Sequence, residues 1–188
     1  MICDAMLAPI GRSLNRLASL RGMMLAFAVA VLCQLAMMPL DMRLQALSGG
    51  LGKLSLLFNA RAMTVIGHLH AYGAEGRRLL FWMDVIDLLF PSALAWTCIQ
   101  AIWLAFRLYA PRLAVCACAF PLAFAILDLA EKTLHFVLLA RFPDASLAIA
   151  GIAALLTTVK LLVLVVSYAG LIAAGIAWVA VRCNRKWQ

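Results

Sequence analysis

The stretch FWMDVIDLLFPSALAW, residues 81–96, is as apolar as the middle of a membrane-spanning helix, yet it carries two aspartates three residues apart. The rest of the chain is equally apolar. Of its 188 residues, 66% are hydrophobic and 13% are charged, and the mean hydropathy is +1.02. A soluble domain is about half apolar and about a quarter charged, so this chain lacks the polar groups to cover a water-facing surface. We therefore expect a single membrane domain over residues 1–188 with the lipid bilayer as its solvent.

Four apolar segments are long enough to cross a bilayer, which takes about 20 residues in a helix. The first follows Arg12, Arg16 and Arg21, but its apolar run exceeds that of a secretory signal peptide and no A-x-A cleavage site follows. We expect it to be retained as a span. The sequence thus predicts an all-α polytopic membrane protein, a four-helix bundle with transmembrane helices at about residues 22–40, 79–106, 113–140 and 147–181.

The basic residues indicate how the chain is oriented. Lys and Arg are slightly denser in the N-terminal tail, the loop between the second and third spans, and the C-terminus than on the opposite side. This bias predicts cytoplasmic termini, in the inner (plasma) membrane if the protein is bacterial. The same residues sit in short clusters beside apolar runs, which is typical of lipid headgroup contact. A nucleic-acid partner is therefore not expected, despite the net charge of +8.

The long outer loop, residues 41–78, shows two further signals. Ser48, Gly49 and Gly50 break it early. A short helix is then predicted from Asn59 as its cap to Gly73 as its stop, and we expect it to lie in the membrane interface or to fold over the helix ends. The apolar face of this helix would consist of Ala62, Val65, Ile66 and Leu69.

Three of the four spans each carry polar side chains on one helical face. A charge at mid-membrane costs about 2.5–3.5 kcal/mol, so these faces must point at one another and not at lipid. Short loops make the second, third and fourth spans antiparallel neighbours, which lets the faces meet. The three groups are Asp84 and Asp87; Asp128, Glu131, Lys132 and His135; and Thr157, Lys160 and Ser167.

These faces predict a polar pocket in the outer half of the bilayer. Its four acids outnumber its two lysines, and the surplus must take up protons, bind a cation or reach water. We therefore expect the pocket to open outward, and Lys160 to pair with an acid among Asp87, Asp128 and Glu131. The expected mouth, which would contact lipid phosphates or an anionic substrate, consists of Arg77, Arg78 and Arg141.

Three classes of function fit such a pocket. The favoured one binds or conducts a cation, a proton or a small polar ligand. The second is a membrane enzyme acting on a lipid-linked substrate, with the acids holding a divalent ion and His135 as base. The third is a structural or accessory subunit whose ion pairs fix helix register. The sequence assigns no catalytic residue, cofactor or metal site.

Other side chains bear on cofactors and partners. None of the cysteines forms a C-x-x-C pair, so a redox or zinc site is not expected. A bridging haem would need a second histidine within the spans, and His68 and His70 lie in the outer loop. The last span has a strip of small residues that would allow close packing against a protein partner or a second copy of the chain, namely Gly170, Ala174 and Gly175.

Three motifs, GRRLLFWMDVIDLLFP, PLAFAILDLAEKTLHFVLLARFP and TTVKLLVL, give residues 72–165 a family resemblance. This region resembles an uncharacterised family of small bacterial four-helix integral membrane proteins with no assigned activity. In that family an asparagine usually follows the glutamate, where this chain has Lys132. The resemblance supports the site without naming a reaction, and its implied counterparts here are Arg77, Asp87, Pro91, Asp128, Glu131, Pro143 and Lys160.

Overall fold

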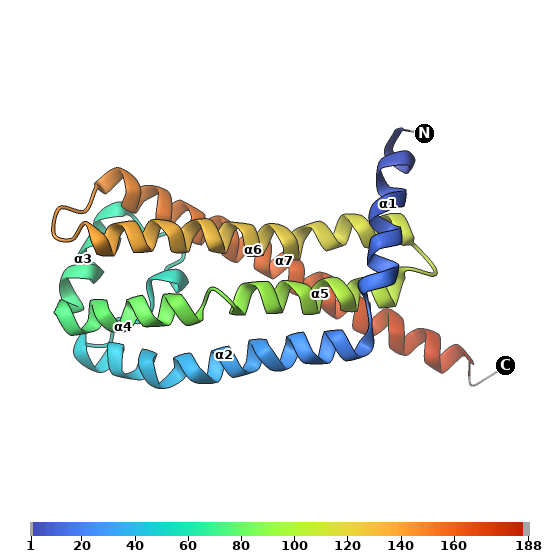
Figure 1. Cartoon of the computed structure of the whole chain (residues 1–188), viewed down its shortest axis with the longest axis horizontal. Helices are drawn as coiled ribbons and strands as arrows, with labels where there is room; N and C mark the ends of the chain where they lie inside the picture. Colours follow the sequence, from blue (N-terminus) through green and yellow to red (C-terminus); the bar gives the residue numbers. More distant parts are fainter. Residues whose placement is uncertain (1, 186–188) are drawn as a thin grey trace.

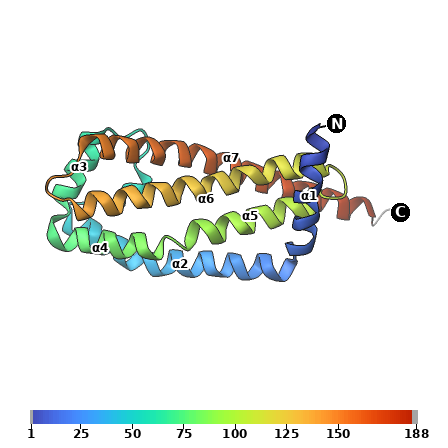
Figure 2. The same ribbon diagram turned by 45° about the horizontal axis from the view of Figure 1, so that its top comes forward.

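The chain folds into a bundle of long helices (Figures 1 and 2). A computed structural model describes residues 2–185, and the side chains of residues 9–176. Within the described residues every regular element is helical, and four helices are long and apolar enough to cross a membrane. The chain is therefore an integral membrane protein. Its elements are α1 (Ile2–Leu17), α2 (Leu20–Leu47), η1 (Leu54–Leu56), α3 (Ala62–Ala71), α4 (Gly73–Ile86), α5 (Phe90–Phe106), α6 (Pro111–Ala140) and α7 (Leu147–Arg185).

The bundle has two distinct ends (Figure 1). At one end, called the loop end below, lie α3 and the turn between α6 and α7. At the other, the terminal end, lie α1 and the turn between α5 and α6. The helix α7 reaches the terminal end as well, so α1 and the end of α7 lie on the same side of the bundle.

The first span, α2, is longer at both ends than its apolar run. It begins after Ser19, whose Oγ accepts a hydrogen bond from the N–H of Gly22 at 3.0 Å. This bond satisfies one of the free N–H groups in the first turn. The helix ends before Gly49 and Gly50, whose φ angles of 69° and 95° favour glycine. The predicted break at this position is thus where the chain turns back.

The second span, predicted over residues 79–106 with a kink at Pro91, is interrupted rather than only bent. α4 ends at Ile86, α5 begins at Phe90, and Asp87 lies in the turn between them. Pro91 has no N–H to donate to the carbonyl of Asp87, so the regular hydrogen-bond pattern cannot continue through this point. The interruption places the Asp87 side chain at the bundle interior, where it is 5% exposed.

The segment between α2 and α4 folds back against the bundle. η1 enters the interior, where Leu54 and Ser55 are buried. Asn59 does not cap the following helix as predicted, because α3 begins at Ala62 after Arg61, and Asn59 itself has a φ of 54°. Its N–H donates instead to the Thr158 hydroxyl at 3.0 Å. The location of α3 in the membrane interface stays a prediction.

The helix α1 was not predicted from the sequence. It lies crosswise to the bundle at the terminal end (Figure 1). The indole N–H of Trp103 in α5 donates a hydrogen bond to the side-chain oxygen of Asn15 in α1 at 3.2 Å. The amphipathic sequence of α1 and this contact hold the helix against the end of the bundle.

Candidate functional site

Eight ionisable side chains form a buried group, called the charged cluster below. They come from α4, α6, α7, the turn after α4 and the segment between α2 and η1. Each is at most 8% exposed. A charge buried so deeply is stable only when it is paired and hydrogen-bonded. The members are Lys53, Asp84, Asp87, Asp128, Glu131, Lys132, His135 and Lys160.

The two aspartates of the opening stretch share one lysine. The Nζ of Lys132 lies 3.0 Å from Oδ1 of Asp84 and 2.8 Å from Oδ2 of Asp87. All three side chains are almost completely inaccessible to solvent. A neutral side chain at position 132 could not balance the charge of two carboxylates. Lys132 is therefore central to the charge balance of this chain.

A second lysine links α6 to α7. The Nζ of Lys160 donates to Oδ1 of Asp128 at 2.7 Å and also to Oε2 of Glu131. The other oxygen of Glu131 accepts a hydrogen bond from the hydroxyl of Thr157 at 2.6 Å. The predicted pairing of Lys160 with buried acids is thereby confirmed for Asp128 and Glu131. Asp87 pairs with other lysines.

A third lysine, Lys53, comes from the segment between α2 and η1 and was not predicted as a site residue. Its Nζ donates to Oδ2 of Asp87 and lies 3.5 Å from the sulfur of Met37. Burial, and next the repulsion of Lys132, lower the pKa of the Lys53 ammonium below its usual range. The surplus of acids is therefore smaller than the sequence indicated. Four carboxylates face three ammonium groups, which leaves one negative charge if His135 is neutral.

His135 lies between two of the carboxylates. Its Nδ1 is 3.3 Å from Oδ2 of Asp84, and its Nε2 is 3.6 Å from Oε1 of Glu131. A neutral imidazole has one N–H and can donate to only one of these acids, whereas a protonated ring carries an N–H toward each. With His135 protonated, the charged cluster is electrically neutral. A proton on His135 would therefore offset the one negative charge that the lysines leave.

Beside the charged cluster lies a partly open cavity of about 150 Å³. Asp128 and Asp41 both line it, and the buried atoms Oδ2 of Asp128 and Oδ1 of Asp41 have no hydrogen-bond partner among the described residues. Two carboxylate oxygens are thus left without a donor. The ionisable side chains that line the cavity are Asp41, Lys53, Asp87, Asp128 and Lys160.

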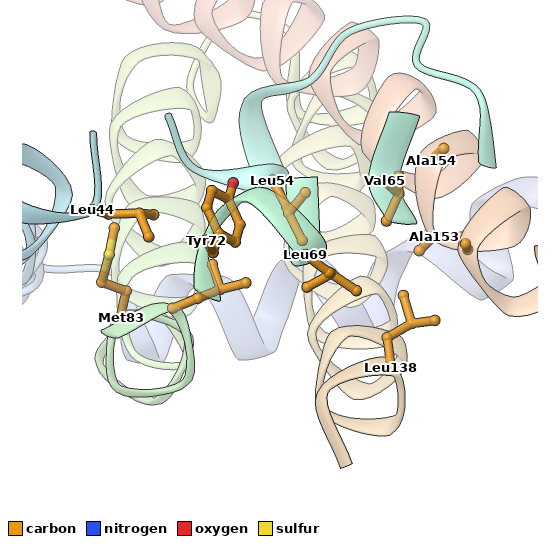
Figure 3. Close-up of a cluster of buried hydrophobic side chains, with 11 residues drawn as sticks. Leu44, Leu54, Val65, Leu69, Tyr72, Met83, Leu138, Ala153 and Ala154 are labelled. Atoms are coloured by element: carbon orange, nitrogen blue, oxygen red, sulfur yellow. The ribbon is translucent and has the colours of Figure 1, made fainter. Parts of the chain in front are cut away.

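An apolar layer, whose side chains Figure 3 shows, lies between the charged cluster and the loop end. On each helix, the members of this apolar layer lie nearer to the loop end than the ionisable residues do. Leu80 precedes Asp84 in α4, and Leu138 follows His135 in α6. A second apolar group lies on the terminal side of the charged cluster, and consists of Ala30, Leu94, Cys98 and Phe124. The charged cluster therefore lies between two apolar layers along the bundle axis.

The cavity opens sideways, between α2 and α7. These two helices make few contacts with each other. The exposed lining residues lie on α2 and η1, namely Gln34, Met38 and Leu56, while Leu161 and Leu164 line the cavity from α7. The opening is therefore at the side of the bundle, not at the loop end where the sequence placed the mouth.

None of the three arginines expected at that mouth lines the cavity. Arg77 donates to the carbonyl of Leu69 at 3.0 Å, and its guanidinium lies 3.8 Å from the centre of the Phe142 ring. It thus ties α4 to the end of α3 and to the turn after α6. Arg78 and Arg141 are exposed at the loop end, where lipid headgroup contact stays a prediction.

Two site residues escaped the sequence analysis, Lys53 and Asp41. Both were assigned to the outer loop, because the apolar run of the first span ends at Leu40. Asp41 in fact lies within α2, and Lys53 reaches the interior because η1 folds inward. A signal was present, since Leu54 at the start of η1 and Leu57 directly after it are too apolar for a solvent-exposed loop.

Within the described part of the chain, no group of three or more His, Cys, Asp and Glu side chains is arranged to hold a metal ion. Each of the four acids already contacts a lysine: Asp84 and Asp87 contact Lys132, and Asp128 and Glu131 contact Lys160. Comparison with known proteins found no matching family model, no matching curated protein and no matching solved structure.

Proposed function

We propose that this protein is a membrane-embedded binding protein whose charged cluster takes up one positive charge, either as a proton or as a cation or small polar ligand in the neighbouring cavity. One observation carries the proposal. The buried acids exceed the lysines by one, and one carboxylate oxygen each of Asp41 and Asp128 beside the cavity has no donor among the described residues. A buried acceptor without a partner lowers the stability of a folded protein by about 1–3 kcal/mol, and a bound cation or hydrogen-bond donor would restore that stability.

The two rival functions fit the site less well. An enzyme using a divalent ion needs carboxylates free to coordinate it, whereas these carboxylates already contact lysines. A purely structural cluster needs every polar atom paired internally, and it needs no cavity. The unpaired oxygen of Asp128 and the adjoining space therefore favour ligand binding over both.

The proposal includes an exchange between the ligand and a proton on His135. The cluster is neutral either with His135 protonated or with one cation bound and His135 neutral. A cation that binds near Asp128 repels the imidazolium proton, which the low dielectric of the interior makes effective. Binding of a monovalent cation should therefore release a proton.

We expect methylammonium, a small primary ammonium ion, to raise the melting temperature of the purified protein in detergent at neutral pH. N-methylglucamine at equal ionic strength is too bulky for the cavity and serves as the control. A pH indicator in weakly buffered solution should report up to one proton released per protein. His135→Gln should bind without this release, and Asp128→Asn should lose the stabilisation. If sodium, potassium and methylammonium all leave the melting temperature unchanged, and no proton is released, the proposal is wrong.

We further propose that the loop end faces outward and that both termini are cytoplasmic, as the distribution of basic residues predicts. Asp144 is an exposed residue in the turn between α6 and α7. In a chain whose own cysteines are replaced by alanine, Asp144→Cys should react with a membrane-impermeant maleimide added to intact cells. Ser13→Cys in α1 is the matched exposed position at the terminal end and should react only after the membrane is opened. The reverse pattern would overturn the orientation.

A further inference from the structure

The way into the cavity shows what kind of ligand it suits. Apolar layers lie on both sides of the charged cluster along the bundle axis, so a ligand that approached from water at either end would have to cross one of them. The side opening between α2 and α7 lies within two spans, where a bilayer would surround it. A ligand already dissolved in the membrane would reach this opening directly.

The lining of the cavity is divided into a charged part and an apolar part. Three of its carboxylates, on Asp41, Asp87 and Asp128, face only two lysine ammonium groups. The opening is bordered by exposed residues of α2 and η1 and by two leucines of α7, and all of them except Gln34 are apolar: Gln34, Met38, Leu56, Leu161 and Leu164. The site therefore presents negative charge inside and a mainly hydrocarbon entrance with one amide side chain.

We propose that the ligand is a membrane amphiphile with a primary amine head group, which enters sideways between α2 and α7. This inference rests on the proposed cation site and names its ligand class. The ammonium donates to Oδ2 of Asp128 and Oδ1 of Asp41, the two carboxylate oxygens that have no partner in the part of the chain that the structure describes. Its hydrocarbon chain passes between Met38 and Leu164 into the bilayer.

The volume of the cavity agrees with partial entry of such a molecule. A cavity of about 150 Å³ has room for a molecule of roughly the size of benzene. That space accommodates an ammonium group and the first few carbons of a chain, but not a whole lipid. The rest of the ligand's hydrocarbon chain remains among the lipid tails, which are as apolar as the leucine and methionine side chains at the entrance.

Dodecylamine is a suitable probe, with dodecanol as its uncharged partner and methylammonium as its chain-free partner. The protein is reconstituted in phosphatidylcholine nanodiscs, and its melting temperature is followed as each probe is added. We expect dodecylamine to raise the melting temperature at a total concentration roughly a hundredfold lower than methylammonium needs. Moving three or four methylene groups out of water gives a factor of about this size. Dodecanol should have no comparable effect.

Two matched substitutions on α7 test the entrance. Leu161 lines the cavity, whereas its neighbour Leu162 is 54% exposed and faces away from it. Leu161→Trp should raise the dodecylamine concentration needed by at least about tenfold, as expected when a few hydrocarbon contacts are blocked. Leu162→Trp should leave it unchanged. Asp128→Asn should abolish the response. If Asp128→Asn does not fold, Asp41→Asn, at a half-buried position, takes its place and should weaken the response.

The outcomes separate this inference from the proposed function. If methylammonium acts at the same concentration as dodecylamine, the cation site stands and the membrane ligand is overturned. The inference also fails if dodecanol matches dodecylamine, or if the two tryptophan variants behave alike. If neither the two amines nor sodium nor potassium stabilises the protein, and no proton is released, the cation site and its ligand are both refuted.

Discussion

Replacing Lys132 with methionine is expected to lower the free energy of unfolding by about 3–5 kcal/mol, the largest effect of any single substitution in the charged cluster. The Lys132 ammonium is fully buried and lies 3.0 Å from Asp84 and 2.8 Å from Asp87. Methionine has a similar length, so the substitution removes the charge with little change in packing. Two carboxylates then lose a partner in a place that water does not reach. Titration with SDS in mixed micelles measures the difference.

Lys53→Met is the matched control for this result. Lys53 also contacts Asp87, but Asp87 keeps Lys132 when Lys53 is lost, whereas no other lysine contacts Asp84 among the described residues. Lys53 therefore shares with Lys132 the neutralisation of Asp87. Removing Lys53 should lower the free energy of unfolding clearly less than removing Lys132. Adding Asp84→Asn to Lys132→Met should recover part of the loss. Equal costs for the two lysines would show that the pairing with Asp84 is not what stabilises the cluster.

The part of the site that lies on long helices could be predicted from the sequence. Helical periodicity places residues three or four apart on one face, so Asp128, Glu131 and His135 had to point the same way. Short loops between α5, α6 and α7 made these helices neighbours. The high cost of a charge in lipid then required the faces to meet. These rules act locally or between adjacent helices, which is why they suffice without a structure.

The rest of the site depends on contacts that no local rule describes. Lys53 meets Asp87 across 34 positions of sequence, because η1 folds into the bundle. Asp41 faces the cavity because α2 continues beyond its apolar run. The break after Ile86 also escaped prediction, since a proline inside a membrane helix is compatible with a kink as well as an interruption. The charge balance and the position of the opening both follow from these three features.

The segment between α2 and α3 lies between the charged cluster and the loop end. Leu54 in η1 is 2% exposed, and it packs with Leu44 and Tyr72 in the apolar layer at the loop end (Figure 3). The hydroxyl of Tyr72 donates to the carbonyl of Gly52 at 2.5 Å, which fixes the segment that carries Lys53. The same inward fold that supplies the third ammonium group therefore also seals the charged cluster from the loop end. Access from the bilayer is what this arrangement leaves open.

Lys160→Met is expected to cost about 3 kcal/mol, less than Lys132→Met, because one of the acids it leaves behind keeps a donor. Lys160 contacts both Asp128 and Glu131, but Glu131 also accepts a hydrogen bond from Thr157 at 2.6 Å. The uncompensated charge therefore falls mainly on Asp128, whose Oδ2 already lacks a partner among the described residues.

Adding Asp128→Asn to Lys160→Met should then restore about half of the lost stability, since the amide removes the charge that has no remaining partner. Asp128→Asn alone leaves Lys160 paired with Glu131, so its own cost should be small. The four proteins form a double-mutant cycle, measured by SDS titration in the same micelles, and the coupling between the two sites should be at least about 1 kcal/mol. A double variant no more stable than Lys160→Met would mean that Asp128 is neutral in the folded protein. The surplus negative charge would then be absent, and with it the attraction that the cavity is proposed to exert on a cation.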